Sequence, residues 1–325
     1  MNLLEKMRII KRGTADNAVV AALQFVHVYE GRIQSTDGKI VIDAQCDELK
    51  GMTFSVPGTK FVKAIEACNG NPKKIELTDT NLQIQDGKFK VKLPLYDGTY
   101  PKREFAFKHE DMVKVIAPLH PLLRRLSPFI GEDASRPWCC GVLFRDGMVT
   151  ATNNTSIVTG SYVFDKPVPA FNLPMFAITE MLTFGREPLA CFVDEVSATF
   201  DYGDFMFKTQ LLPSDWPDTS KLLGAPSDKL KPVPDALLEA VDKITAFCPD
   251  SDFQCIVFDT DKISTAEGTT FAELAGFELS QGRYRAVVLR TVLNEASHVD
   301  FSAYPNPIPF TTDAGLRGVF VGVRA

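Results

Sequence analysis

Residue types that carry catalysis are present in this sequence, but not at the spacings that catalysis requires. The seven cysteines contain no Cys-x-x-Cys pair and no histidine at the spacing of a metal ligand set. The four histidines are far apart, and Asp and Glu are abundant but scattered, so no carboxylate pair stands out as a general acid and base. The sequence has no P-loop, dinucleotide-binding glycine motif, nucleophile elbow or zinc-protease motif. We therefore predict a protein that is not an enzyme, with no catalytic residue, metal or cofactor.

The cysteines and the N-terminal segment indicate a compartment. Most cysteines fall within apolar strand or helix patterns, which favours small core residues in a reducing environment. Residues 1–13 are interrupted by charge every few positions, unlike a signal peptide. No apolar run approaches the roughly 20 residues that cross a bilayer. These features favour a cytoplasmic protein without a membrane partner.

Length and charge set wider limits. A chain of 325 residues, with 45% hydrophobic and 23% charged residues, is long enough for two or three folded domains. The net charge of −6, taken alone, argues against nucleic-acid binding. Because a basic surface can coexist with an acidic remainder, the placement of the charges matters more than their sum.

The stretch Val56–Pro94 predicts one helix followed by three antiparallel strands. The helix places Phe61, Ile65 and Cys68 on one face, at the spacing of a buried side. Alternating apolar residues follow, and the dipeptide at 86–87, Asp-Gly, favours a two-residue hairpin turn. The pattern is typical of an α+β module.

The same pattern returns at Leu173–Pro217, at a nearly constant offset, and more faintly after Pro234. Matched pairs are Pro57 with Pro174, Gly87 with Gly203, Pro94 with Pro213, and Tyr100 with Trp216. Such an ordered series indicates duplication of a whole domain. We predict domains at residues 1–106, 107–226 and 227–325. The predicted helices span residues 3–12, 58–68, 118–126, 174–186, 235–247 and 285–296, and the predicted strands include Val19–Tyr29 and Phe271–Leu279.

The second repeat carries a family resemblance. Leu122–Asp133 followed by Ser135–Ile157 resembles the bacterial DNA polymerase III β subunit, the sliding clamp, where a helix, an acidic loop, Ser-Arg-Pro and an apolar strand occur in this order. Residues 216–218, Trp-Pro-Asp, stand where the family has Phe-Pro-Asp. The resemblance covers the whole chain and is weakest in the third domain.

Two departures accompany the resemblance. Residues 153–156, Asn-Asn-Thr-Ser, replace the family's Asp-Gly-His-Arg, and the ending Val321–Ala325 lacks the methionines and proline of Met-Pro-Met-Arg-Leu. The chain is similar to a divergent member, and a phage origin is one interpretation of these departures.

The resemblance implies an α+β DNA-clamp fold of three similar domains, each with two helices on the inner face and two antiparallel sheets outside. Two copies would close head to tail as a homodimer ring around double-stranded DNA, without sequence preference. The implied function is that of a processivity factor in DNA replication, which tethers a DNA polymerase and is placed on DNA by a clamp loader.

If the helices line the ring, their basic residues would face phosphates. The six predicted helices together carry a net positive charge, so the strands and loops carry more negative charge than the chain as a whole. The alternative is that these residues lie on ordinary solvated helix faces. The predicted DNA-facing residues are Lys6, Arg8, Lys11, Arg12, Lys60, Lys63, Arg124, Arg125 and Arg290.

The resemblance also implies two protein contacts. In the family, partners insert a short hydrophobic peptide between domains two and three, and Tyr100 matches a position near the seam between protomers. For Cys139 and Ile157, the alternative is an interior strand residue. The matched cleft positions are Cys139, Thr152, Ile157, Leu222, Leu223, Val321, Val323 and Arg324.

Two other functions stay open on the sequence alone. One is a monomeric clamp-fold adaptor or inhibitor of a replication machine, which does not encircle DNA. The other is a thiol or carboxylate hydrolase whose catalytic residues meet only in space, for which a cysteine of low pKa would be the signature.

Overall fold

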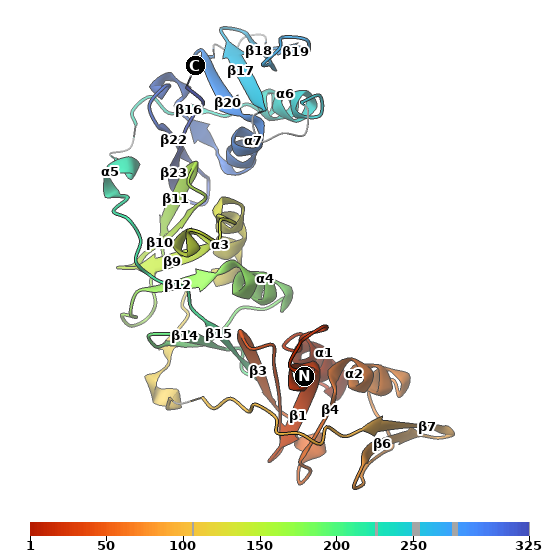
Figure 1. Ribbon diagram of the computed structural model, residues 1–325. Coiled ribbons are helices and arrows are strands. Elements are labelled where there is room, and N and C mark those ends of the chain that lie inside the picture. The colour runs from red at the N-terminus through yellow and green to blue at the C-terminus, as the bar shows by residue number, and fades with distance from the viewer. Residues whose placement is uncertain (106, 225–226, 249–253, 275–278, 325) are drawn as a thin grey trace. The chain divides into compact units, whose positions relative to one another are not determined.

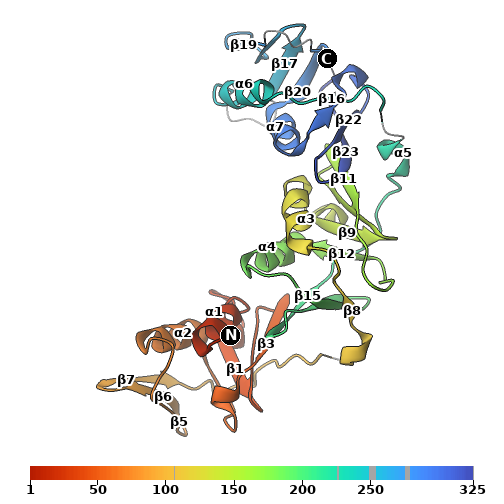
Figure 2. The same cartoon turned by 180° about the vertical axis from the view of Figure 1, so that it is seen from behind.

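The order of elements repeats three times along the chain. The computed structural model describes residues 1–105, 107–224, 227–248, 254–274 and 279–324 (Figures 1 and 2). Each repeat contains a helix, four antiparallel strands of which the fourth pairs with the first, a second helix and a three-stranded meander. The predicted domain boundaries, after residues 106 and 226, fall on positions outside the described residues.

The first repeat contains two helices and seven strands. They are α1 (Leu3–Lys11), β1 (Phe25–Tyr29), β2 (Arg32–Thr36), β3 (Ile40–Gln45), β4 (Phe54–Pro57), α2 (Gly58–Ala67), β5 (Lys74–Leu77), β6 (Asn81–Asp86) and β7 (Phe89–Pro94). Short 3-10 helices cover Ala21–Gln24 and Asp47–Leu49.

The second repeat adds a short strand before its first helix. Its elements are β8 (Val113–Lys114), α3 (Leu119–Leu126), β9 (Gly141–Arg145), β10 (Met148–Thr152), β11 (Ser156–Ser161), β12 (Phe171–Pro174), α4 (Met175–Thr183), β13 (Ala190–Val193), β14 (Ser197–Asp201) and β15 (Phe205–Gln210). The 3-10 helices here are His109–Asp111, Ser127–Phe129 and Pro137–Cys139.

The third repeat follows a helix that the sequence did not predict, α5 (Ser220–Leu223). Its elements are β16 (Lys231–Pro232), α6 (Asp235–Thr245), β17 (Cys255–Asp259), β18 (Lys262–Thr265), β19 (Phe271–Glu273), β20 (Gly282–Arg285), α7 (Ala286–Glu295), β21 (His298–Val299), a 3-10 helix (Phe301–Ala303), β22 (Ile308–Thr311) and β23 (Arg317–Phe320). Residues 275–278 of the predicted strand Phe271–Leu279 lie outside the described residues.

The chain forms two compact units that do not coincide with the repeats. Unit 1 contains residues 1–120, 164–169 and 176–211, and unit 2 contains residues 121–163, 170–175 and 212–325. Each unit holds one eight-stranded antiparallel sheet, ordered β4-β1-β2-β3-β15-β14-β13-β8 in unit 1 and β12-β9-β10-β11-β23-β22-β21-β16 in unit 2. Each large sheet therefore joins strands of two successive repeats.

The junctions within the two large sheets are alike. In unit 1, β3 pairs antiparallel with β15, with Val41 opposite Lys208. In unit 2, β11 pairs antiparallel with β23, with Ile157 opposite Val319. Two smaller sheets remain, β5-β6-β7 in unit 1 and β19-β18-β17-β20 in unit 2.

Helix α1 shows how local sequence builds a repeat. The Asn2 side chain accepts a hydrogen bond from the Glu5 backbone N–H at 2.9 Å, and the Glu5 carboxylate accepts one from the Asn2 backbone N–H at 3.0 Å. This capping box satisfies two donors at the helix start. Met7 and Ile10 are buried, and α1 lies beside α2 over one face of the strands β2 and β3 (Figures 1 and 2).

The predicted duplication is visible in matching backbone features. Pro57 ends β4 and Pro174 ends β12, each directly before a helix. Gly87 and Gly203 occupy equivalent hairpin turns with φ of 58° and 82°, a region that suits glycine. All six predicted helices are confirmed, with ends that differ by at most a few residues.

Two local predictions were wrong. The strand predicted from residue 19 begins at Phe25, because Val19 and Val20 are exposed and a 3-10 helix precedes the strand. Cys139, for which an interior strand position was the alternative, does not lie in a strand, because Pro137 opens a 3-10 turn that ends at Cys139. All seven cysteines are free thiols.

Candidate functional site: an apolar cleft and a basic helix face

Five of the seven cysteine thiols have a raised pKa, the opposite of an activated nucleophile. Burial raises the pKa of Cys46 and of Cys191 to about 12, so both thiols are neutral near pH 7. Burial also raises the pKa of Cys68, Cys140 and Cys248. Among the described residues, no three His, Cys, Asp or Glu side chains are grouped as a metal site requires. These observations do not favour a thiol hydrolase.

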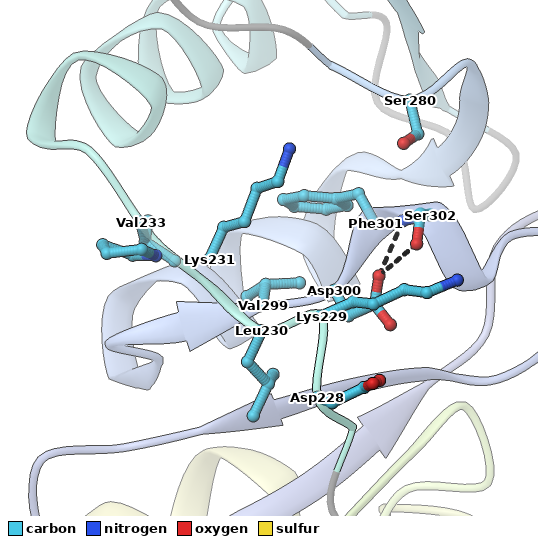
Figure 3. A pocket seen from close by; sticks show the side chains of 11 residues that line it. Asp228, Lys229, Leu230, Lys231, Val233, Ser280, Val299, Asp300, Phe301 and Ser302 are labelled. Atoms are coloured by element: carbon cyan, nitrogen blue, oxygen red, sulfur yellow. Dashed lines mark hydrogen bonds between the residues drawn. The ribbon is translucent and has the colours of Figure 1, made fainter.

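A pocket of about 480 Å³ with mixed polar and apolar lining lies in unit 2 beside the segment 228–233 (Figure 3). The Asp300 carboxylate in this pocket accepts hydrogen bonds from the Ser302 backbone N–H at 3.0 Å and from the Ser302 hydroxyl at 2.5 Å (Figure 3). The Ser227 hydroxyl donates a third bond to Asp300 at 2.7 Å. Asp300 therefore links the segment at Ser227 to the 3-10 turn at Ser302 by hydrogen bonds. We assign it a structural role.

A second cavity in unit 2 is mainly apolar. It holds about 190 Å³ at the junction of β11 and β23, and α5 closes one side. Leu222 and Val321 line it while remaining 51% and 44% exposed, so two large apolar side chains face a hollow that the described residues do not fill. An apolar hollow of this kind suits the hydrophobic side chains of a bound segment. The lining residues are Trp138, Thr152, Asn154, Thr155, Ser156, Ile157, Pro217, Asp218, Thr219, Leu222, Pro307, Val319 and Val321.

One wall of this cleft is the turn between β10 and β11. Asn153 accepts hydrogen bonds from the backbone N–H groups of Thr155 and Ser156, at 3.1 and 2.8 Å. Asn154 has a φ of 68°, a left-handed conformation that Asn tolerates better than most residues. Residues 153–156 thus form a tight turn, with Asn153 as the acceptor and Asn154 at the left-handed position.

The structure brings together four of the eight predicted cleft residues as lining, namely Thr152, Ile157, Leu222 and Val321. Val323 lines an adjoining cavity of about 280 Å³ together with Val321. Cys139 is fully buried, with its thiol 3.6 Å from the Asn154 side-chain nitrogen, and it does not line the cleft. Leu223 and Arg324 are also not among the lining residues of either cavity.

Several lining residues were missed by sequence reasoning. Trp138 and Pro217 lie inside the motifs that carried the resemblance, so a signal for them existed. The sequence carried no motif that pointed to Pro307 or Val319. The strands β11 and β23 are far apart in sequence, and only their pairing brings this part of the chain to the cleft.

The chain's last residues are fixed beside the cleft by hydrogen bonds. The Val321 backbone N–H donates to the Thr155 carbonyl at 3.0 Å, and the Val323 backbone N–H donates to the Arg283 carbonyl at 2.7 Å. The Tyr304 hydroxyl donates to the Val323 carbonyl at 2.7 Å. Residues 321–323 are thus held beside the cleft by hydrogen bonds, and Val321 also lines it.

Most of the predicted DNA-facing cations lie on helices but are paired with carboxylates. Lys6 lies 3.0 Å from Glu48, Arg8 2.9 Å from Glu66, Lys11 3.2 Å from Asp16, Arg12 2.8 Å from Glu180, Arg125 3.3 Å from Glu295 and Arg290 2.6 Å from Asp242. Each pairing lowers the charge that the helix presents to a phosphate. Sequence reasoning missed these acids because most of them lie on other elements.

Lys60, Lys63 and Arg124 differ from the other six. All three are exposed, and within the described ranges no carboxylate lies within 4.0 Å of their charged groups. Lys60 and Lys63 project from α2, and Arg124 from α3. Arg12, Arg186 and Arg285 fall just outside the observed helices, so the helices carry less positive charge than their predicted bounds implied.

Tyr100 packs inside unit 1. Its ring stacks on His27 with centroids 4.9 Å apart, it is only 8% exposed, and its hydroxyl donates to the Gln34 carbonyl at 3.4 Å. These contacts hold the segment after β7 against the large sheet. A seam role for Tyr100 stays a prediction.

No helix in the described part of the chain is both long enough and apolar enough to span a bilayer. Helix α2, for example, packs through one apolar face that includes the buried Phe61 and Ile65.

Solved structures with the same fold are bacterial sliding clamps, whereas no protein-family model and no curated protein matches the sequence. The Helicobacter pylori β clamp bound to a DNA ligase peptide has 17% identity and a TM-score of 0.78, over 99% of this chain and 98% of that chain. The Bacillus subtilis DNA polymerase sliding clamp has 15% identity and a TM-score of 0.80, over 99% and 97%. The β subunit from the DNA polymerase of Streptococcus pyogenes has 16% identity and a TM-score of 0.78, over 99% and 97%. This chain therefore has the α+β fold of the DNA polymerase III β-subunit sliding clamps.

Proposed function

We propose that the protein is a DNA sliding clamp, in which two copies close head to tail into a ring around duplex DNA. The observation that carries this proposal is the arrangement of the sheets. Each of the two large sheets joins the four strands that follow the first helix of one repeat to the three-stranded meander of the next repeat. The joining pairs are β3 with β15 and β11 with β23. The remaining half-sheets, β19-β18-β17-β20 and β5-β6-β7, are the two parts of a third such sheet.

The two free edges are complementary. By analogy with the two junctions within the chain, β19 of one copy would pair antiparallel with β7 of the other. The strand β7 carries exposed Lys90 and Lys92, and β19 carries exposed Glu273. Phe89 and Phe271 are 41% and 58% exposed on the same two strands. An unpaired edge with exposed aromatic rings favours association by strand addition.

In this proposal the three repeats, with boundaries near residues 106 and 226, act as equivalent modules, and six of them surround the duplex. The helix faces attract phosphates weakly through Lys60, Lys63 and Arg124, which suits movement along DNA without sequence readout. The apolar cleft of unit 2 receives a short hydrophobic segment of a DNA polymerase or of a clamp loader. The protein acts as a tether and carries out no catalysis.

A monomeric clamp-fold adaptor is the second candidate. It is favoured by the pairing of six predicted DNA-facing cations with carboxylates, which reduces attraction to DNA. The solution mass separates the two candidates, because one protomer has a mass of 35.9 kDa and the ring has twice that mass.

The seam can be tested by charge reversal. We expect the wild type to sediment as a dimer at micromolar concentration, and Lys90→Glu/Lys92→Glu to sediment as a monomer because these edges then repel Glu273. Adding Glu273→Lys to the same chain should restore the dimer, since each seam regains opposite charges. A dimer that persists in the double variant, or a wild type that is monomeric, would contradict ring closure at these edges.

A further inference from the structure

A groove of about 570 Å³ in unit 1 has no part in ring closure or in the apolar cleft. It lies at the junction of β3 with β15, and the segment after β7 closes one side. Lys39 and Val41 line it from the start of β3, Lys102 and Arg103 from the closing segment, and Lys208 from β15. The groove is therefore built from elements that are rigidly hydrogen-bonded within one unit.

This groove is the counterpart, in the preceding pair of repeats, of the apolar cleft in unit 2. In the turn between β2 and β3, the Thr36 hydroxyl donates to the Ile40 carbonyl at 2.7 Å and accepts from the Gly38 N–H at 3.1 Å. In the turn between β10 and β11, the Thr152 hydroxyl donates to the Ser156 carbonyl at 2.7 Å and accepts from the Asn154 N–H at 3.2 Å. The two turns have the same hydrogen bonds, so the walls beside them are equivalent.

The equivalence extends to the other walls but the chemistry changes. Val319, opposite Ile157 in the apolar cleft, is matched by Lys208, opposite Val41. Asp218 and Thr219, which follow Trp216-Pro217, are matched by Lys102 and Arg103, which follow Tyr100-Pro101. Thr155 is matched by Lys39. At these positions the groove of unit 1 thus has cations where the cleft of unit 2 has apolar, neutral or acidic residues.

The cations of this groove are ordered without being neutralised. The Lys102 ammonium lies 4.2 Å from the centroid of the Tyr29 ring, and the Lys208 ammonium lies 5.9 Å from that of the Phe105 ring. Within the described residues, Lys102, Arg103 and Lys208 have no carboxylate within 4.0 Å. An aromatic face positions an ammonium group while leaving its charge available to an anion.

Of the two carboxylates that line the groove, Asp194 is already engaged. It accepts hydrogen bonds from the backbone N–H groups of Val196 and Ser197, at 2.9 and 2.7 Å, and from the Ser197 hydroxyl at 2.7 Å. Burial would raise the pKa of Asp194, but the Ser197 hydrogen bonds and nearby Lys208 hold it below the ordinary value. The turn thus keeps this carboxylate occupied, and Glu104 is the other acidic residue in the lining.

Gln34 fixes the cationic wall in place. Its side-chain oxygen accepts from the Arg103 backbone N–H at 2.7 Å, and its side-chain nitrogen donates to the Arg103 carbonyl at 2.8 Å. Gln34 is fully buried and also donates to Asp43 at 2.9 Å. The Arg103 backbone is therefore held at the groove, while its guanidinium stays exposed.

The position of the groove on the sheet favours an acidic protein segment over duplex DNA as its ligand. Helix α1 packs on the β3 face that carries Ile42, as shown by the hydrogen bond from the Ser35 hydroxyl to the Ile10 carbonyl. Val41 and Lys208 belong to the opposite face, since side chains alternate along a strand. Duplex DNA held on the helix side does not reach this face, whereas a protein segment on the outer side does.

We propose that this groove is a second docking site, which binds an extended acidic segment of a partner protein. Acidic side chains of the segment pair with Lys102, Arg103 and Lys208, and an apolar side chain contacts Val196, which lines the groove and is 70% exposed. The choice of a protein segment over DNA rests on the proposed function, in which duplex DNA lies on the helix side. The groove itself shares no lining residue with the apolar cleft and none with β7 or β19, so its test is separate from theirs.

The test uses the full-length protein and a fluorescein-labelled peptide of alternating Asp and Glu around one Leu, measured by fluorescence anisotropy. We expect Lys102→Glu/Arg103→Glu/Lys208→Glu to weaken binding by at least about tenfold. The matched control Lys50→Glu/Lys166→Glu/Lys229→Glu makes the same charge change at exposed positions outside the groove and should change binding by less than about twofold. Leu222→Asp in the apolar cleft should leave it unchanged, and circular dichroism should show the same fold for every variant.

Four results would overturn the proposal. The first is that the acidic peptide does not bind the wild type, and the second is that the two triple variants lose binding equally. The third is that a peptide with Asn and Gln in place of Asp and Glu binds equally well. The fourth is that duplex DNA displaces the peptide and that the affinity for this DNA falls only in the groove variant. The last result would assign the groove to nucleic acid. Photo-crosslinking from the central position of the peptide should label the segment that contains Val196.

Discussion

At the scale of single residues, the protonation of His27 makes the stability of unit 1 depend on pH. Its ring lies between Tyr29 and Tyr100, with centroids 5.4 and 4.9 Å away, and one ring nitrogen lies 2.9 Å from the Ser55 hydroxyl. Burial, and then the nearby Lys102, lower the pKa of His27 below its ordinary value of 6.5. The folded protein therefore favours the neutral ring.

This shift predicts a pH dependence with a definite sign. As the pH falls below 6.5, the unfolded chain takes up a proton on His27 more readily than the folded protein does, so stability is lost. We expect the melting temperature to fall between pH 7.5 and 5.5, and the fall to be smaller in His27→Phe, which keeps a ring but cannot be protonated. Identical pH profiles for the two proteins would contradict the role of His27. Asp194 and Asp204 do not interfere, because lowered carboxylate pKa values act only below about pH 4.

The charged residues of the helices predict a salt effect. Replacing the unpaired cations, in Lys60→Gln/Lys63→Gln/Arg124→Gln, should lower the salt dependence of DNA binding by about 0.9 in log–log slope for each phosphate that is no longer neutralised. The matched control Arg8→Gln/Glu66→Gln removes an ion pair without changing net charge, and its slope should equal that of the wild type. Fluorescence anisotropy with a labelled duplex across salt concentrations measures both. Equal slopes in the wild type and the triple variant would show that these residues do not bind phosphates.

At the scale of elements, the short helix α5 forms one side of the apolar cleft. It presents Leu222, which is 51% exposed, to the apolar cleft opposite the β11–β23 junction. A partner's hydrophobic side chain would bury Leu222 together with Val321. The helix thus completes a site that the sheet alone leaves open.

Leu222→Asp should therefore weaken binding of a peptide that carries a Leu-Phe pair by more than about tenfold, since it places a charge where an apolar contact forms. Val163→Asp adds the same charge at a position that is 60% exposed and outside the cleft, so it should bind as the wild type does. Isothermal titration calorimetry measures both affinities. Unchanged binding by Leu222→Asp would show that the peptide does not occupy the cleft.

The elements that the sequence predicted best are those set by local pattern. The helices followed from apolar spacing and the hairpins from glycine turns, as at Phe61, Ile65 and Gly87. The pairing of β3 with β15 and of β11 with β23 was not predictable, because each pair is far apart in sequence. For the same reason, the sequence placed Ile157 and Leu222 at the cleft only through a family resemblance, and it missed Val319.

The ion pairs show the same limit. Arg12 and Glu180 lie on different repeats, yet their side chains meet at 2.8 Å. A charge count along the sequence treats Arg12 as free for DNA, whereas the folded chain partly neutralises it. The charge count along the sequence therefore did not show which individual cations are paired with carboxylates.

At the scale of the whole molecule, ring closure requires completion of a third large sheet between copies. The chain holds two sheets that join successive repeats and two half-sheets with opposite charges at their free edges. If β7 and β19 of different copies pair, every repeat has the same neighbours, and the protein can be held on DNA by topology. Retention would then depend on the ends of the DNA more than on contacts with it.

The most direct measurement is retention on circular and linear DNA. The dimers are dissociated and allowed to re-form in the presence of a nicked circular plasmid. The plasmid is then separated from free protein by gel filtration at high salt, and an enzyme cuts it once. We predict that the protein stays with the circle and is released when the circle is cut. Equal retention before and after cutting, or equal loss from both forms, would contradict a closed ring around DNA.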